Sequence, residues 1–361
     1  MGDIEKMRRI AIICSYDGTN YSGFQIQANA STIQEELELS LEKLFGKRIC
    51  VHGCSRTDAG VHAMGLVAHF DLDNSIPDAK IPLAMNSKLR EGIRVLKAVT
   101  MPQNFHSRFD SIGKTYIYKM QIGNTCTACE EKYQAFVPTY KYQFDVDKLI
   151  LAAVYIIGEK DFKAFQAAGS DLKGSTIRKI DRIKISVRRS FSFMRAKKDN
   201  FISKKLADSS LYCISEASYL LLDAVMPSAG ELKYFEDNEA YKLINRTAML
   251  KHYVDTELNL DKYNDEKIFC CMSSASAVND VISAPFQLEI EVHGNGFLYN
   301  MVRILAGTLL YILEGRLNIS DLIIAVEKGD RTGIGKTMPA KGLYLNKVDY
   351  PSEVENILYK Y

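Results

Sequence analysis

The sequence predicts an α+β protein made of two similar halves, each with one layer of helices on one sheet. Two observations support this fold class. Short segments of alternating or β-branched residues recur along the chain, and a few amphipathic helices interrupt them. The first such pattern is complete before Pro102 and then recurs loosely, which divides the chain into residues 1–102 and 103–361. With 361 residues, 47% of them apolar, the chain is long enough for two domains.

The first half opens with a strand at residues 9–16, a run rich in β-forming side chains that an Asp-Gly turn ends. Residues 31–45 predict a helix, because apolar residues recur on one face, a serine or threonine can cap the start and a glycine can end it. A tight polar loop separates the next two strands, and another strand follows. These three strands are expected at residues 48–54, 66–72 and 93–99.

The second half repeats this alternation of strands and helices. Periodicity predicts helices at residues 146–157, 298–313 and 319–327, and strands at residues 114–122, 177–187, 286–292 and 342–350.

Residues 189–283 do not follow this rhythm, because their periodicity is poor and their composition is mixed. A structureless loop of that length is uncommon inside a domain. We interpret the segment as an insertion between two neighbouring strands. It contains short helical candidates, such as residues 239–250, and forms either a small helical subdomain or a partly mobile segment.

Composition argues against a small secreted protein and a membrane protein, but it does not identify a binding partner. The net charge is +2, from 46 basic and 44 acidic residues, which neither requires nor excludes nucleic acid. Eight scattered cysteines are not the framework of a small secreted protein. The first nine residues lack an apolar signal core, and no run approaches the roughly 18 apolar residues of a membrane span. We therefore expect a cytoplasmic protein with no membrane contact.

The loop at residues 54–63, CSRTDAGVHA, carries the clearest chemical signal. Turn-forming neighbours should present Asp58 at the tip of the loop. Arg56 lies two residues earlier, and a guanidinium beside a carboxylate favours its ionised form. An ionised aspartate can act as a nucleophile or a general base, while Arg56 could instead hold a phosphate. The alternative is an ordinary Asp-Gly-type turn with a structural ion pair.

The string RTDAGVHA at residues 56–63 closely resembles the signature loop of the tRNA pseudouridine synthase A family. Other segments resemble motifs of the same family, in the family's order. They are YDGTNYSGFQIQ at 16–27, FHSRF at 105–109, KTYIY at 114–118, DFKAF at 161–165, GNGFLYNMVR at 294–303 and GLYL at 342–345. The long insertion is the one large departure from the family pattern.

This resemblance implies roles for particular residues. Asp58 would be the nucleophile, Arg303 the arginine that pairs with it, and Tyr116 the aromatic residue that packs against the target base. Other residues would bind the substrate. Leu343 would be an apolar residue of the pocket lining, and Asn300 belongs to the GNGFLYNMVR motif. Arg56 and Arg108 would be basic groups near the RNA.

The resemblance also implies a fold and partners. The family fold is two ferredoxin-like halves that form one mainly antiparallel sheet, with helices on one side and the active cleft between the halves. The implied substrate is the tRNA anticodon stem-loop, at positions 38 to 40, and the implied assembly is a homodimer. Isomerising uridine requires no redox change, so we expect no cofactor and no metal.

Other functions stay open at this stage. One is a catalytically inactive tRNA-binding or RNA-binding relative, and another is a pseudouridine synthase with a different RNA target. A hydrolase or glycosidase would need a second carboxylate near Asp58, and no motif supplies one. Product analysis separates these functions.

Two further motifs have alternative interpretations. Cys126 and Cys129 form a lone CxxC, and Cys270 with Cys271 would be a poor second half for a tetrahedral zinc site, so free thiols are the simpler interpretation. His62 could be a general base, but in a loop after a glycine we favour a role in orienting the turn.

Overall fold

The computed structural model describes residues 7–139, 144–169, 174–189, 218–226, 231, 233, 237, 242–244, 268–272 and 286–360. These residues form a mixed α+β fold with a mostly antiparallel sheet, which confirms the expected α+β class and the mainly antiparallel sheet. None of the helices in these ranges is long and apolar enough to cross a membrane.

The N-terminal part is built around strand β1 (Arg8–Tyr16), which pairs antiparallel with β3 (His62–Leu72) on one side and β4 (Ile93–Met101) on the other. Helix α1 (Ile33–Phe45) packs its apolar face into the core. The Thr32 hydroxyl caps this helix by accepting a hydrogen bond from the Glu35 backbone nitrogen at 3.4 Å, and Gly46 ends it at φ 70°. A short helix not predicted from the sequence, α2 (Ile81–Asn86), precedes β4.

The strand predicted at residues 48–54 is wrong in extent, because only β2 (His52–Gly53) pairs with β3. The side chains of α1 take the place of a strand partner at Val51. Its backbone nitrogen donates to Glu38 Oε1 at 3.1 Å, and its carbonyl accepts from Gln34 Nε2 at 3.0 Å. Burial of apolar side chains such as Val51 produced the strand-like pattern without a ladder.

Four strands of the C-terminal part each match a predicted one. They are β5 (Gly113–Gly123), β8 (Ile177–Arg189), β12 (Phe286–Gly294) and β13 (Leu343–Asp349). Its predicted helices are α3 (Val146–Ile156), α7 (Met301–Leu313) and α8 (Ile319–Lys328). Short elements β6 (Ala135–Pro138), β7 (Gly158–Asp161) and α9 (Ser352–Leu358) were not predicted.

The described part of the insertion extends the sheet. Its strands β9 (Ser218–Val225), β10 (Lys242–Ile244) and β11 (Ile268–Met272) add to the free edge of β8. The helix expected at residues 239–250 is therefore wrong at residues 242–244, where the backbone pairs antiparallel with β11. Strands β8 and β12 are neighbours, which confirms that the insertion lies between adjacent strands. The remainder of this segment lies outside the described residues.

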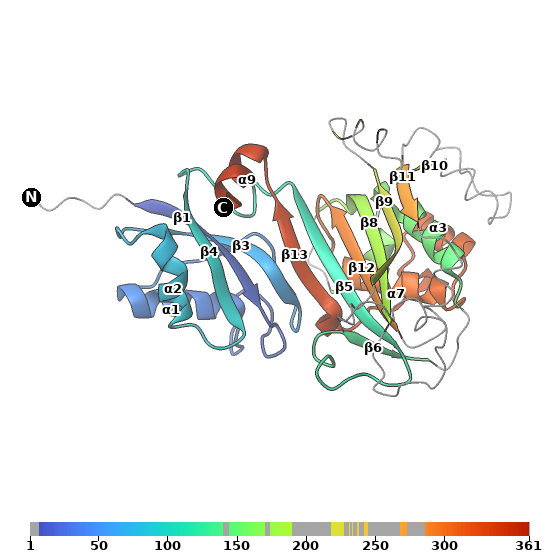
Figure 1. The fold of residues 1–361 in the computed structure, drawn as a ribbon, viewed down its shortest axis with the longest axis horizontal. Helices are drawn as coiled ribbons and strands as arrows, with labels where there is room; N and C mark the ends of the chain where they lie inside the picture. The colour runs from blue at the N-terminus through green and yellow to red at the C-terminus, as the bar shows by residue number, and fades with distance from the viewer. Residues whose placement is uncertain are drawn as a thin grey trace, which may run out of the picture.

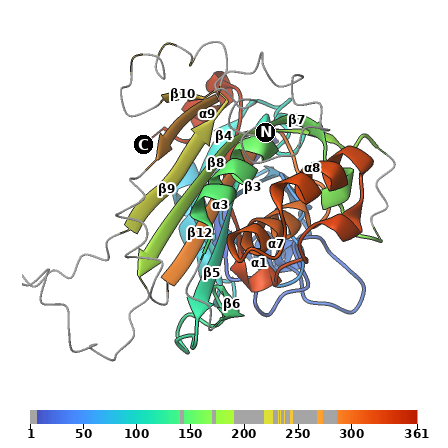
Figure 2. The same ribbon diagram turned by 90° about the vertical axis from the view of Figure 1, so that its right-hand side faces the viewer.

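The sheet runs in the order β10-β11-β9-β8-β12-β5-β13-β3-β1-β4 (Figure 1). Strand β13, from the end of the chain, joins the two parts by pairing antiparallel with β5 and parallel with β3. Figure 2 shows α1, α3, α7 and α8 on one side of this sheet. The core lies between these helices and the buried face of the strands.

Candidate active site

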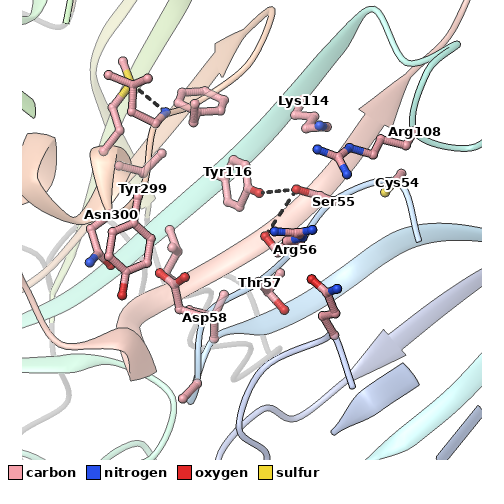
Figure 3. Close-up of a pocket in the computed structure, with 18 of the residues that line it drawn as sticks. Cys54, Ser55, Arg56, Thr57, Asp58, Arg108, Lys114, Tyr116, Tyr299 and Asn300 are labelled. Carbon is pink, nitrogen blue, oxygen red and sulfur yellow. Dashed lines mark hydrogen bonds between the residues drawn. The ribbon is translucent and has the colours of Figure 1, made fainter. Parts of the chain in front are cut away.

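The loop between β2 and β3 holds Asp58 in a tight turn. The Val61 backbone nitrogen donates to the Asp58 carbonyl at 3.1 Å, and Gly60 adopts φ 76°. A glycine suits this left-handed conformation because a side chain there is strained. The turn leaves the Asp58 side chain 30% exposed and directed into a pocket (Figure 3).

The segment at residues 16–27 supports this loop from behind. The Tyr16 hydroxyl lies 2.8 Å from Thr57 Oγ1, and the Phe24 backbone nitrogen donates to the Thr57 carbonyl at 3.1 Å. Gly23 has φ 95°, and a Cβ added there would lie 2.5 Å from the same carbonyl oxygen. The glycine therefore permits the close approach of two backbones that fixes the loop.

Arg303, in the first turn of α7, is the ion-pair partner of Asp58, with 3.6 Å between Arg303 Nη1 and Asp58 Oδ2. Two other bonds fix the guanidinium, because Nη1 donates to Asn300 Oδ1 at 2.6 Å and Nε donates to the Met338 carbonyl at 2.7 Å. Asn300 has φ 59°, a left-handed conformation that asparagine tolerates, and so α7 begins at Met301 instead of the predicted residue 298.

The electrostatic setting of Asp58 differs from the sequence-based expectation. Burial raises the pKa of its carboxyl, and the Arg303 guanidinium lowers the pKa by a smaller amount. Arg56, expected to be the neighbouring guanidinium, is exposed and forms no ion pair with the described residues. The short sequence distance of two residues was misleading, because the turn directs the two side chains to different parts of the pocket (Figure 3).

The pocket has a volume of about 1070 Å³. Its lining comes from the Asp58 loop, from β5, from the start of α7 and from the segments beside them. Six of the residues expected at the site line it, namely Arg56, Asp58, Arg108, Tyr116, Asn300 and Leu343, while Arg303 contacts it through Asp58 and Asn300.

Tyr116 forms an aromatic wall of the pocket. Its ring meets the Phe297 ring edge to face, with 5.2 Å between centroids and 82° between planes. Its hydroxyl lies 3.3 Å from Ser55 Oγ, and only 7% of the residue is exposed. Burial raises the pKa of the phenol, so Tyr116 is neutral at physiological pH.

The aromatic and basic lining residues include four that were not singled out from the sequence. Phe297 and Tyr299 lie within the GNGFLYNMVR motif and Lys114 begins the KTYIY motif, so the signal for these three was present in quoted motifs. Arg178 lies in β8 outside any motif, and its guanidinium donates to the carbonyls of Ser175 and Ile177. Nothing local in the sequence marks Arg178.

His62 lies outside the pocket lining. Its Nδ1 accepts a hydrogen bond from the Gly18 backbone nitrogen at 3.1 Å and lies 3.2 Å from Asp17 Oδ1. The ring stacks on Tyr344 with 4.7 Å between centroids. These contacts tie the start of β3 to the neighbouring turn, in agreement with the turn-orienting role favoured from the sequence.

The cysteines form no recognisable metal site in the part of the chain that the structure describes. Cys126 is half-buried, Cys129 is exposed and Cys270 is buried in β11, while the side chain of Cys271 lies outside the described residues. No group of three histidine, cysteine or acidic side chains that could hold a metal occurs among the described residues.

Comparison with known proteins matches this arrangement of motifs. A family model described as tRNA pseudouridine synthase matches residues 12–110 and 243–351. The tRNA pseudouridine synthase A of Ruminiclostridium cellulolyticum is 33% identical over 344 residues, covering 95% of this chain and 100% of that protein. The synthases of Clostridium kluyveri, at 32% over 344 residues, and Thermoanaerobacter pseudethanolicus, at 30% over 351, cover the same shares. The chain therefore belongs to the tRNA pseudouridine synthase A family of isomerases.

Proposed function

We propose that the enzyme isomerises uridine to pseudouridine at positions 38 to 40 of the tRNA anticodon stem-loop, with Asp58 as the nucleophile. One observation carries this proposal. Among the described residues that line the pocket, Asp58 is the sole carboxylate, and Arg303 lies 3.6 Å from it. A glycosidase would use two carboxylates about 5–10 Å apart, so a single carboxylate supports isomerisation over hydrolysis.

The reaction breaks the N1–C1′ bond of uridine, turns the uracil, and forms a C5–C1′ bond. Attack on the sugar, attack on the base and removal of a sugar proton all begin with an ionised Asp58. Arg303 favours that form against the effect of burial. Asn300 and the Met338 carbonyl hold the guanidinium in place, so they position the Arg303–Asp58 pair.

The pocket also supplies a place for an extruded base. A uridine in a stem must leave the stack before a carboxylate can reach its glycosidic bond. Tyr116 offers a fixed aromatic face, and Leu343 supplies apolar lining from β13. Stacking on an aromatic side chain contributes about 1–3 kcal/mol per base. Because the ring is packed against Phe297, little side-chain entropy is lost on binding.

Charge in the pocket fits an RNA substrate. Arg56, Arg108, Lys114 and Arg178 line it together with one carboxylate, so the described lining is net positive although the chain as a whole is near neutral. Cations that contact phosphates release counterions, and binding then weakens as salt rises. We expect tRNA affinity to depend steeply on ionic strength.

The proposal extends to the architecture and the assembly. We propose two ferredoxin-like halves, residues 1–102 and 103–361, with the pocket as the active cleft between them. The lining supports this division, since Asp58 comes from the first half and Tyr116 and Asn300 come from the second. A cytoplasmic homodimer that needs no cofactor rests on the family resemblance, and sedimentation equilibrium with and without tRNA tests the dimer.

The substrate position is tested with unmodified tRNA transcripts incubated with the enzyme in the presence of EDTA. Carbodiimide labelling and primer extension then map each new pseudouridine. We expect modification at positions 38 to 40 alone, and none in a matched transcript that carries cytidine there. Pseudouridine at other positions would assign the enzyme a different RNA target, and binding without any product would contradict the proposed reaction.

A further inference from the structure

One end of the pocket gathers positive side chains that have no acidic partner among the residues that the structure describes. Figure 3 shows Lys114 and Arg108 beside each other near Arg56, while Asp58 and Asn300 lie toward the other end. The Arg108 guanidinium lowers the pKa of Lys114, in keeping with two cations that lie side by side. The carboxylate of Asp58 is already paired with Arg303, so it does not neutralise this end.

Lys114 is the most unusual of the three cations. It is partly buried, and in the described part of the chain its ammonium forms no ion pair and no hydrogen bond. Burial lowers its pKa, and so does Arg108. The ionisable group that would raise the pKa of Lys114 is the Cys54 thiol, but burial raises the pKa of that thiol to about 11. At neutral pH the thiol is uncharged and does not compensate the ammonium.

The sheet fixes where this side chain begins. Lys114 begins the KTYIY run of β5, where its backbone pairs with Gly294 of β12 and with Val348 of β13. Its side chain therefore starts from a rigid strand and lines the pocket. Partly buried charges are normally paired, because desolvation without a partner is costly. A partly buried cation that has no partner among the described residues is therefore a candidate ligand contact.

We propose that Lys114 binds a phosphodiester of the RNA strand next to the extruded uridine, and that Lys114, Arg108 and Arg56 form a three-cation phosphate site at the end of the pocket away from Asp58. The inference rests on the proposed function, because it takes RNA as the ligand. The inference adds Lys114 to the residues that bind RNA and places a phosphate at the end of the pocket away from Asp58. A phosphate bound there would fix the RNA strand while the extruded base extends toward Tyr116 and Asp58.

The test compares three variants by tRNA filter binding across a range of potassium chloride concentrations. Lys114→Gln removes the charge, Lys114→Arg keeps it, and Lys119→Gln removes a charge from the same strand outside this pocket, where Lys119 pairs with Glu289. For Lys114→Gln we expect about tenfold weaker binding and a salt slope smaller by about 0.7–0.9, the value of one lost phosphate contact. Lys114→Arg should restore both, and Lys119→Gln should change neither.

Two further readouts separate ligand binding from a structural role. Because Lys114→Gln removes an unpaired charge, its denaturant midpoint should equal or exceed that of the parent enzyme. Replacing single phosphates near the target uridine by neutral methylphosphonates should weaken binding by the parent at one position, and Lys114→Gln should be insensitive at that position. An unchanged salt slope in Lys114→Gln, or equal sensitivity to every methylphosphonate, would overturn the proposal. The readout is formation of the complex and not of product, so this result is independent of whether Asp58 proves to be the nucleophile.

Discussion

His293 of β12 provides a quantitative test of how the sheet is held together. Its Nδ1 bonds to Asp181 of β8, and its Nε2 lies 2.8 Å from Asp349 Oδ2 of β13. A Cβ added at Gly113 of β5 would lie 2.6 Å from Nε2, so the ring also packs tightly against that strand. Burial lowers the pKa of His293, but the two carboxylates outweigh it and raise the pKa to about 9. The protonated ring therefore connects the strands around the pocket.

Whether His293 makes the protein more or less stable as pH rises follows from its protonation in the folded and unfolded chain. Below the ordinary pKa of 6.5, His293 is protonated in both the folded and the unfolded chain. Between 6.5 and about 9 the unfolded chain releases the proton first, so the free energy of unfolding falls as pH rises. At about 1.4 kcal/mol per pKa unit the full loss is roughly 3 kcal/mol. The side chain is 26% exposed, and solvent screening reduces this to about 2 kcal/mol.

The measurement is urea unfolding of the parent, His293→Gln and His52→Gln at intervals between pH 6.5 and 8.5. The buried cysteines have an ordinary pKa of 9.0, so they begin to contribute only at the upper end of this window and contribute equally in all three proteins. The parent and His52→Gln, whose histidine is exposed, should lose on the order of 1–2 kcal/mol across the window. His293→Gln should start less stable and lose almost nothing. Equal pH dependence in the parent and His293→Gln would refute the reasoning.

Three other substitutions test the site. Arg303→Gln should move the acidic limb of the kcat–pH profile to higher pH, because the guanidinium lowers the pKa of Asp58, and an unmoved limb would contradict the pair. Tyr116→Leu should lower kcat/KM by roughly 10- to 100-fold through lost stacking, whereas Tyr116→Phe should stay within about tenfold of the parent; equal losses would exclude stacking. Gly23→Ala should lower both activity and stability, because its added Cβ would lie 2.5 Å from the Thr57 carbonyl oxygen. Gly46→Ala should lower only stability, because Gly46 also has a positive φ of 70° but its added Cβ would meet no atom within 4 Å. Equal activities of the two variants would show that the close approach of Gly23 to the Asp58 loop is unimportant for catalysis.

Much of the fold could be predicted because the signals are local. The 31–45 helix carries its own cap, apolar face and terminal glycine, and β12 alternates buried and half-buried residues throughout. The central place of β13 could not be predicted in this way, since it depends on pairing with strands far away in the chain. The strand predicted at residues 48–54 was wrong at residues 48–51, although their composition is typical of a strand. Side chains of α1 make the backbone hydrogen bonds at Val51 that a neighbouring strand would otherwise make.

In the candidate site, too, some features follow from local sequence and others depend on distant parts of the chain. The turn that presents Asp58 follows from its own sequence, and the structure places the residues of distant motifs around it. Sequence proximity suggested Arg56 as the charge next to Asp58, whereas the ion pair is made by Arg303, which lies 245 residues after Asp58 in the chain. Only the family resemblance pointed to Arg303. Arg178 reaches the pocket from β8 without any motif, and so required the three-dimensional arrangement.

The identity of the nucleophile is tested most directly by tritium release from tRNA labelled at C5 of uridine, with single-turnover amounts of enzyme. Asp58→Asn changes one oxygen to nitrogen and keeps the volume, and Asp110→Asn is a matched change outside the pocket lining. We expect Asp58→Asn to bind tRNA with an affinity close to that of the parent and to release tritium at least about 10⁴-fold more slowly, while Asp110→Asn keeps the parent rate. Tritium release by Asp58→Asn within about tenfold of the parent, with pseudouridine in the product, would contradict the assignment.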